Sequence, residues 1–337
     1  MEIIIGLLII AVGAFCQSSS YVPINKIKDW SWESYWLVQG VFAWLIFPIA
    51  GAMLAVPEGE SLWALYAAHP RESLLTALFG VLWGVGGLTF GLSMRYLGVA
   101  LGQSLALGTC AGLGTILTPL LLGRAADLTT AVVAGVVVTL IGIAIIGVAG
   151  HMKSQSLSEE EKRKAVKDFN FTKGIAVALL AGFMSACFNI GLGFGEQLNF
   201  GDQTADIFMT LPATFMVTLG GFATNAIYCL YQNSRNKSFS DYSKGSLWLN
   251  NLLFCALAGV LWYSQFFGLS LGKGFLADSP ALLTFSWCIL MALNVVFSNV
   301  WGIILKEWKG CSRSTIAVLI IGIAVLVISS FLPEILK

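Results

Sequence analysis

Ten apolar stretches of roughly 20 residues each follow one another along this 337-residue sequence. A helix needs about 20 predominantly apolar residues to cross the hydrocarbon core of a bilayer. Inside lipid, only helices and closed barrels satisfy every backbone hydrogen bond. The sequence therefore predicts an all-α integral membrane protein with ten transmembrane helices over residues 3–21, 35–56, 73–94, 97–122, 128–150, 174–195, 206–231, 246–271, 280–305 and 314–333.

Charged residues are too few for a water-soluble protein of this length. Asp, Glu, Lys and Arg make up 11% of the sequence, and hydrophobic residues make up 57%. Soluble domains carry about 25% charged residues. The net charge is only +1, and no run of Lys and Arg is interleaved with aromatic residues. We therefore expect a lipid bilayer around the protein and no nucleic acid as a partner.

The basic residues are distributed unevenly among the predicted loops. Lys and Arg accumulate in cytoplasmic loops. If the N-terminus lies outside the cytoplasm, alternate loops place fifteen of the 19 basic residues inside. The other four would lie outside: Arg71, Arg124, Lys273 and Lys337. A miscounted span would remove this asymmetry, so it supports ten spans and predicts that both termini are external.

Short sequence matches recur between the two halves of the chain. The Gly-Val-Leu-Trp of residues 80–83 recurs at 259–262, and the Gly-Leu-Ser of residues 91–93 recurs at 268–270. Both matches relate the third predicted span to the eighth. Because five spans per half is an odd number, the two repeats must be inverted, as is common in transporters. We predict a first five-helix repeat, a cytoplasmic linker and a second five-helix repeat over residues 1–150, 151–173 and 174–337.

Glycines recur every three or four residues in the third predicted span, at Gly80, Gly84, Gly87 and Gly91. Small residues at this spacing let two helix backbones approach closely. Close packing is the simpler interpretation of the stripe. The alternative is a smooth face that slides while the protein changes conformation.

Residue patterns typical of enzymes are absent from the sequence. There is no HExxH, no GxSxG and no pair of carboxylates within the spans. Both histidines, His69 and His151, lie in predicted loops. No two cysteines have the spacing of metal ligands. We expect neither an enzyme nor a metal or cofactor site.

The predicted spans contain no Asp, Glu, Lys or Arg, apart from Asp206 at a boundary. A charged substrate needs a compensating charge near the membrane midplane, so we expect a neutral one. Amide side chains exchange hydrogen bonds with hydroxyls, and aromatic rings cover the apolar face of a pyranose. We predict a sugar site between the two halves that contains Gln17, Trp83, Asn189, Trp262 and Gln265. The alternative is that the amides only join helices and the Trp residues lie in interfacial belts.

A carboxyl group that couples transport to protons needs partial burial. The acidic candidates lie at the ends of spans. Glu196 and Asp206 flank the connection between the sixth and seventh spans, and we rank them first. Glu33 follows a Trp-rich turn and is the third candidate.

Four segments resemble, in order, motifs of the bacterial L-rhamnose–proton symporter family. They are residues 28–33 (its KxWSWE), 94–98 (Met-Arg-Tyr-Leu-Gly), 262–267 (its WYxQFF) and 305–308 (its LKEW). The resemblance implies the two inverted repeats of the drug/metabolite transporter superfamily. It also implies uptake of a 6-deoxyhexose with a proton across the bacterial cytoplasmic membrane, so the external termini would be periplasmic. It adds Tyr263 to the predicted sugar site. The glycine-rich stretch between Trp83 and Gly91 departs from the family pattern, where Asn is expected.

Two other functions are open at this point. An exporter or uniporter of another neutral metabolite would use the same helices. A membrane sensor or assembly protein that transports nothing would need a soluble signalling module or a partner-binding tail, and no predicted linker is long enough to hold a domain. The oligomeric state, monomer or homodimer, is undecided.

Overall fold

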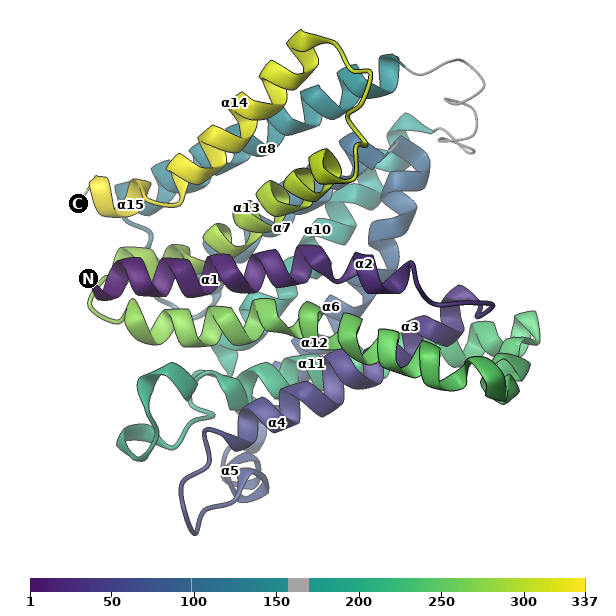
Figure 1. The fold of residues 1–337 in the computed structure, drawn as a ribbon. Helices are drawn as coiled ribbons and strands as arrows, with labels where there is room; N and C mark the ends of the chain where they lie inside the picture. Colours follow the sequence, from purple (N-terminus) through teal and green to yellow (C-terminus); the bar gives the residue numbers. More distant parts are fainter. Residues whose placement is uncertain (98, 157–169, 337) are drawn as a thin grey trace. The chain divides into compact units, whose positions relative to one another are not determined.

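The computed structural model describes residues 1–97, 99–156 and 170–336, which form helices joined by turns, with no strand among them (Figure 1). The chain divides into two compact units. Unit 1 comprises Met1–Gly84 and Gly191–Phe275, and unit 2 comprises Val85–Ile190 and Leu276–Lys337. Each unit therefore combines segments from both halves of the sequence. These units do not coincide with the two predicted sequence repeats, 1–150 and 174–337, which stay a prediction.

Unit 1 contains most of the residues that the sequence analysis singled out. Its helices α1 and α12 lie side by side (Figure 1). A Cβ atom on Gly13 would lie 2.7 Å from the carbonyl oxygen of Ser264, so only glycine permits this approach. The elements of unit 1 are α1 (Glu2–Ser19), α2 (Tyr21–Ile24), α3 (Trp32–Gly40), η1 (Val41–Ile46), α4 (Phe47–Met53), α5 (Leu62–Ala68), the first part of α6 (Pro70–Leu97), η3 (Gly201–Gln203), η4 (Asp206–Phe208), α11 (Leu211–Asn236), η5 (Ser238–Ser243) and α12 (Gly245–Phe275).

The second predicted span is helical throughout, but one turn of it is wider than an α-helix. Between α3 and α4, η1 is a π-helical turn in which the Phe47 N–H donates to the carbonyl of Phe42, five residues earlier. Pro48 gives a physical reason for this turn. In a regular α-helix its ring would collide with the carbonyl of Trp44, four residues before it. A wider turn relieves this collision and changes the direction in which Trp44 points.

Unit 2 contains a second pair of neighbouring helices, α8 and α14 (Figure 1). A Cβ atom on Gly322 would lie 2.6 Å from the Ile146 side chain, and the Thr139 hydroxyl donates to the Ser329 hydroxyl at 2.9 Å. The elements of unit 2 are the rest of α6, α7 (Val99–Leu121), η2 (Ala125–Asp127), α8 (Thr130–Gln155), most of α10 (Phe171–Phe194), α13 (Pro280–Ile304), α14 (Arg313–Ser329) and α15 (Leu332–Ile335).

Every predicted span is helical over most of its length. Within the described ranges, nine helical segments are long and apolar enough to cross a membrane. The tenth predicted span corresponds to α14, which has only 17 residues. At 1.5 Å per residue this helix is about 25 Å long, somewhat less than the hydrocarbon core. A turn at Ser330 and Phe331 ends it, and Pro333 then lies in the short helix α15.

The predicted linker over residues 151–173 is shorter than expected at both ends. Helix α8 continues to Gln155, so His151 lies in a helix and not in a loop. Helix α10 already begins at Phe171. The remaining linker residues, 157–169, lie outside the described residues.

The glycine stripe of α6 has two different environments. A Cβ atom on Gly80 would collide with the carbonyl oxygen of Val217 in α11, and one on Gly84 would lie 2.7 Å from the Thr224 Cβ. Gly87 and Gly91 have no such neighbour within 4 Å among the described residues. The first two glycines therefore serve the close packing of α6 on α11.

This difference predicts opposite effects for one substitution at two sites. Gly80→Ala should destabilise the protein by about 1–3 kcal/mol, because the added methyl group overpacks the contact with α11. Gly87→Ala should leave stability unchanged or raise it by up to about 1 kcal/mol, because alanine favours a helix. The midpoint of thermal unfolding of detergent-purified protein measures both. Similar shifts in the two variants would contradict the assigned packing.

Candidate functional site

Four aromatic side chains of unit 1, Trp44, Trp83, Trp262 and Phe266, form what we call the tryptophan cluster. The Trp44 ring meets Trp262 and Trp83 edge to face, with centroids 5.6 Å and 6.1 Å apart. The Trp83 and Trp262 rings are 5.7 Å apart, and Phe266 lies 5.2 Å from Trp262. These separations are typical of favourable aromatic pairs. Trp83 and Trp262, which the sequence repeat had paired, are therefore direct neighbours.

The cluster continues towards the start of α3. The Trp36 ring lies 5.6 Å from Trp44 and stacks on Trp32 at 5.4 Å. The Trp36 indole N–H donates to the Asn225 side chain at 3.0 Å, and the Asn225 amide donates to the carbonyl of Gly221 at 2.9 Å. Helices α3 and α11 are thus joined by a tryptophan whose polar atom is paired.

The three other predicted sugar-site residues of unit 1 lie on α1 and α12. Gln265 is buried, and its amide donates to the carbonyl of Trp262 at 3.2 Å. Tyr263 is buried with its hydroxyl against Gly51. Gln17 is half-buried near the end of α1, the helix that packs on α12. Their assignment to a sugar site stays a prediction.

Glu33 lies in a group of hydrogen-bonded side chains that we call the carboxylate network: Glu33, Ser34, Asn233, Ser238 and Asp241. Glu33 is buried, and its Oε1 accepts from the Ser238 hydroxyl at 2.7 Å. The Ser34 hydroxyl lies 2.9 Å from both the Asn233 carbonyl oxygen and the Asp241 carboxylate. The network joins the first turn of α3 to the end of α11 and to η5. Asn236, just outside this group, also donates to Glu33 Oε1 at 3.0 Å.

Asp241 is a buried, ionised carboxylate in η5, between α11 and α12. Burial by itself raises the pKa of this carboxyl, but the Lys244 ammonium, the Ser31 N–H and the Ser34 hydroxyl donate to it and lower its pKa to about 2. The Ser31 N–H lies 2.7 Å from Oδ2, and Lys244 Nζ lies 2.8 Å from Oδ1. Asp241 therefore holds the segment before α3 in place.

The two acidic residues that were ranked first have a different environment from Glu33. Glu196 and Asp206 are both exposed in the connection between α10 and α11. Asp206 begins the short helix η4, and Glu196 follows the last turn of α10. Of the three acidic candidates, only Glu33 is buried.

The sixth predicted sugar-site residue, Asn189, belongs to unit 2. Its amide nitrogen donates to the carbonyl of Gly114 at 2.9 Å and to the Thr118 hydroxyl at 3.1 Å. Next to it, Phe188 stacks on Trp287 at 5.7 Å. The donors of Asn189 thus join α10 to α7, which agrees with the structural alternative for an amide within the membrane. Its role in a sugar site is untested.

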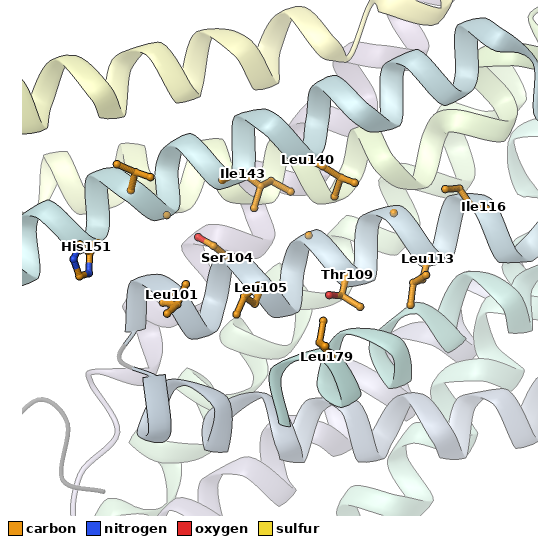
Figure 2. Close-up of a pocket in the computed structure, with 15 residues that line it drawn as sticks. Leu101, Ser104, Leu105, Thr109, Leu113, Ile116, Leu140, Ile143, His151 and Leu179 are labelled. Carbon is orange, nitrogen blue, oxygen red and sulfur yellow. The ribbon is translucent and has the colours of Figure 1, made fainter. Parts of the chain in front are cut away.

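Unit 2 also has a cavity of about 780 Å³ between α7, α8 and α10. Figure 2 shows Leu105, Leu113 and Ile116 of α7 opposite Leu140 and Ile143 of α8. His151 lies at one end of the cavity. The lining contains none of the predicted sugar-site residues and no amide side chain. This cavity suits a hydrocarbon chain better than a polyol, and we do not assign the sugar to it.

Several residues of the tryptophan cluster and of the carboxylate network were absent from the sequence predictions. Trp44 and Asp241 were not singled out, and neither were the partners of Glu33. One signal was present for Trp44, because four of the 11 tryptophans fall within residues 30–44. Among the described residues, no group of three His, Cys, Asp or Glu side chains could hold a metal ion.

A family model and two known relatives all point to the same family of transporters. Residues 1–334 match the model of a family described as the L-rhamnose-proton symport protein. The chain is 32% identical over 341 aligned residues to the L-rhamnose-proton symporter of Yersinia pestis strain Pestoides F, with 97% of this chain and 96% of the relative covered. The symporter of the same name from Yersinia pseudotuberculosis serotype O:1b shows the same identity and coverage. These relatives are named as transporters and not as enzymes.

The environment of Asp241 predicts a pH-dependent contribution to stability. Its folded-state pKa of about 2 is below the usual 3.8, so ionised Asp241 stabilises the fold by about 2 kcal/mol above pH 4. This contribution disappears as the pH falls from about 4 to 2. Asp241→Asn should therefore lower the thermal unfolding midpoint at pH 7, and the difference from wild type should shrink below pH 4.

The control is Asp202→Asn, which changes an exposed carboxylate and should have no effect on the unfolding midpoint. A difference that stays constant down to pH 2 would contradict this assignment.

Proposed function

The chain belongs to the L-rhamnose–proton symport family, and from that membership we propose that it imports L-rhamnose together with a proton. The match along nearly the whole chain is the observation that carries this proposal. The residues are compatible with it, because a neutral deoxy sugar requires no charged group in the membrane. An exporter or uniporter of another metabolite is not favoured, because the two Yersinia relatives reported above are both named as symporters.

The proposed sugar site is centred on the tryptophan cluster. A 6-deoxyhexose has an apolar face with a methyl group and a rim of hydroxyls. Trp83 and Trp262 can cover the apolar face, while the amides of Gln265 and Gln17 can bind hydroxyls. The buried hydroxyl of Tyr263 has no hydrogen-bond partner among the described residues, which supports its inclusion. The predicted role of Asn189, which belongs to unit 2, stays a separate prediction.

Glu33 is our first choice for the residue that carries the coupled proton. It is the buried member of the three acidic candidates, and both of its donors, Ser238 and Asn236, belong to other elements. A conformational change that separates α3 from the end of α11 and from η5 would remove these donors. A carboxyl group changes its proton affinity when its hydrogen bonds are lost. This links proton binding at Glu33 to the movement of α3.

We place the protein in the bacterial cytoplasmic membrane with ten spans, counting α14 as the tenth. The distribution of Lys and Arg supports periplasmic termini. In that orientation the carboxylate network lies at the cytoplasmic ends of α3 and α11, where a proton from the periplasm would be released. Rocking of helix groups in the two inverted repeats would provide alternating access.

Uptake into proteoliposomes tests the proposed function. Labelled L-rhamnose should accumulate when the outside is made acidic, and a protonophore should abolish the accumulation. Uptake that reaches only equilibrium with and without the gradient would indicate a uniporter. Failure to take up or bind L-rhamnose would refute the sugar assignment.

The same assay tests the role of Glu33. Glu33→Gln removes the titratable proton and keeps the size of the side chain, so it should abolish accumulation driven by the pH gradient. Exchange of internal for external L-rhamnose should persist, because exchange does not require net proton movement.

Two exposed acids provide matched controls for this variant. Glu196→Gln and Asp206→Asn should both accumulate L-rhamnose like the wild type. Loss of accumulation in either control, together with full accumulation by Glu33→Gln, would move the coupling role away from Glu33.

A further inference from the structure

The indole N–H of Trp44 is a buried hydrogen-bond donor without an acceptor. Trp44 is only 3% exposed. Within the described part of the chain, no acceptor pairs with its Nε1 atom. Leaving a donor unpaired in the protein interior is energetically costly. Such groups are rare in folded proteins, and each one needs an explanation.

Three neighbouring features of the second span determine where the Trp44 side chain lies. The π-helical turn Val41–Ile46 sets the direction of this side chain, and Pro48 favours that turn. Gly40 leaves room for the ring, because a Cβ atom at this position would lie 2.6 Å from the Trp44 ring. Single π-turns in α-helices frequently occur at functional sites. The chain thus departs from regular helix geometry at the residue that holds the unpaired N–H.

The surroundings of Trp44 are aromatic on three sides. Its ring meets Trp36, Trp83 and Trp262 edge to face at angles of 70°, 89° and 84°. These rings restrict the rotation that would bring Nε1 to another acceptor. Trp36 provides a contrast, because its own Nε1 is paired with Asn225. Of the four rings in the cluster, Trp262 is the least buried. It is therefore the ring with the most room to move aside for a ligand.

We propose that the Trp44 indole N–H binds a hydroxyl oxygen of the transported sugar and that Trp44 is a further substrate-binding residue. This inference rests on the proposed function. An indole N–H is a donor only and carries no charge, so it suits a neutral ligand with acceptor oxygens. The neighbouring rings suit the C–H face of the same ligand.

The first test is L-rhamnose uptake by full-length Trp44→Phe protein in proteoliposomes. Phenylalanine keeps an aromatic ring and removes the N–H. The half-saturation constant KM should rise about tenfold, the factor expected for one unmade hydrogen bond. Trp30→Phe is the matched control. Trp30 Nε1 is also buried without a partner, but its ring meets Tyr242 and not the tryptophan cluster. The KM of this control should equal that of the wild type.

Sugar derivatives distinguish a hydrogen bond from a structural effect. The wild-type protein should show a raised KM for L-rhamnose derivatives that lack the hydroxyl at carbon 2, 3 or 4. Trp44→Phe should lose this penalty for one of the three, because that hydroxyl no longer has its donor. Equal penalties for all three derivatives in both proteins, or an unchanged KM for L-rhamnose, would overturn the role of Trp44.

A second variant leaves Trp44 itself unaltered. Pro48→Ala removes the cause of the wide turn and favours a regular helix, so it should not impair folding. It should turn the N–H away from the sugar and also raise KM. A wild-type KM in both Pro48→Ala and Trp44→Phe would refute the inference while leaving L-rhamnose transport intact. Failure of the wild type to transport L-rhamnose would refute the proposed function itself.

Discussion

The hydrocarbon core of a membrane offers no hydrogen-bond partner to a polar group. Each buried donor or acceptor must therefore find its partner within the protein. Most buried polar side chains described above obey this constraint. Asn189 donates to α7, Asn225 binds Trp36 and the α11 backbone, and Ser34 lies between Asn233 and Asp241. Trp44 and Tyr263 of unit 1 are among the exceptions, and both lie on helices that also supply residues of the tryptophan cluster or flank them.

The tryptophan cluster and the carboxylate network of unit 1 are connected through α3. At its first turn, Glu33 accepts hydrogen bonds from Ser238 and Asn236. One turn later, Trp36 contacts both Trp44 and Asn225. A movement of α3 would therefore alter the environment of the carboxyl group and of the aromatic cluster at the same time. Such a connection is what a symporter needs, because sugar and proton must be bound and released together.

Much of the fold could be predicted because hydrophobic length is a local property of the sequence. All ten apolar runs are helical over most of their length, and Trp83 and Trp262, which the repeat matches had paired, are in contact. The π-turn at Trp44 could not be predicted, because periodicity assumes a regular helix. The partners of Glu33 were also missed, since Ser238 is 205 residues away in the sequence. The ranking of Glu196 and Asp206 above Glu33 relied on position at a span end, which does not determine burial, and their role in proton coupling stays a prediction.

The most direct test of symport is to measure proton entry caused by the sugar itself. Proteoliposomes that contain a pH-sensitive dye, without an imposed pH gradient, would receive L-rhamnose on the outside. The account predicts that the lumen becomes more acidic as L-rhamnose enters, and that vesicles without the protein show no change. Entry of L-rhamnose with a constant lumenal pH would contradict proton symport.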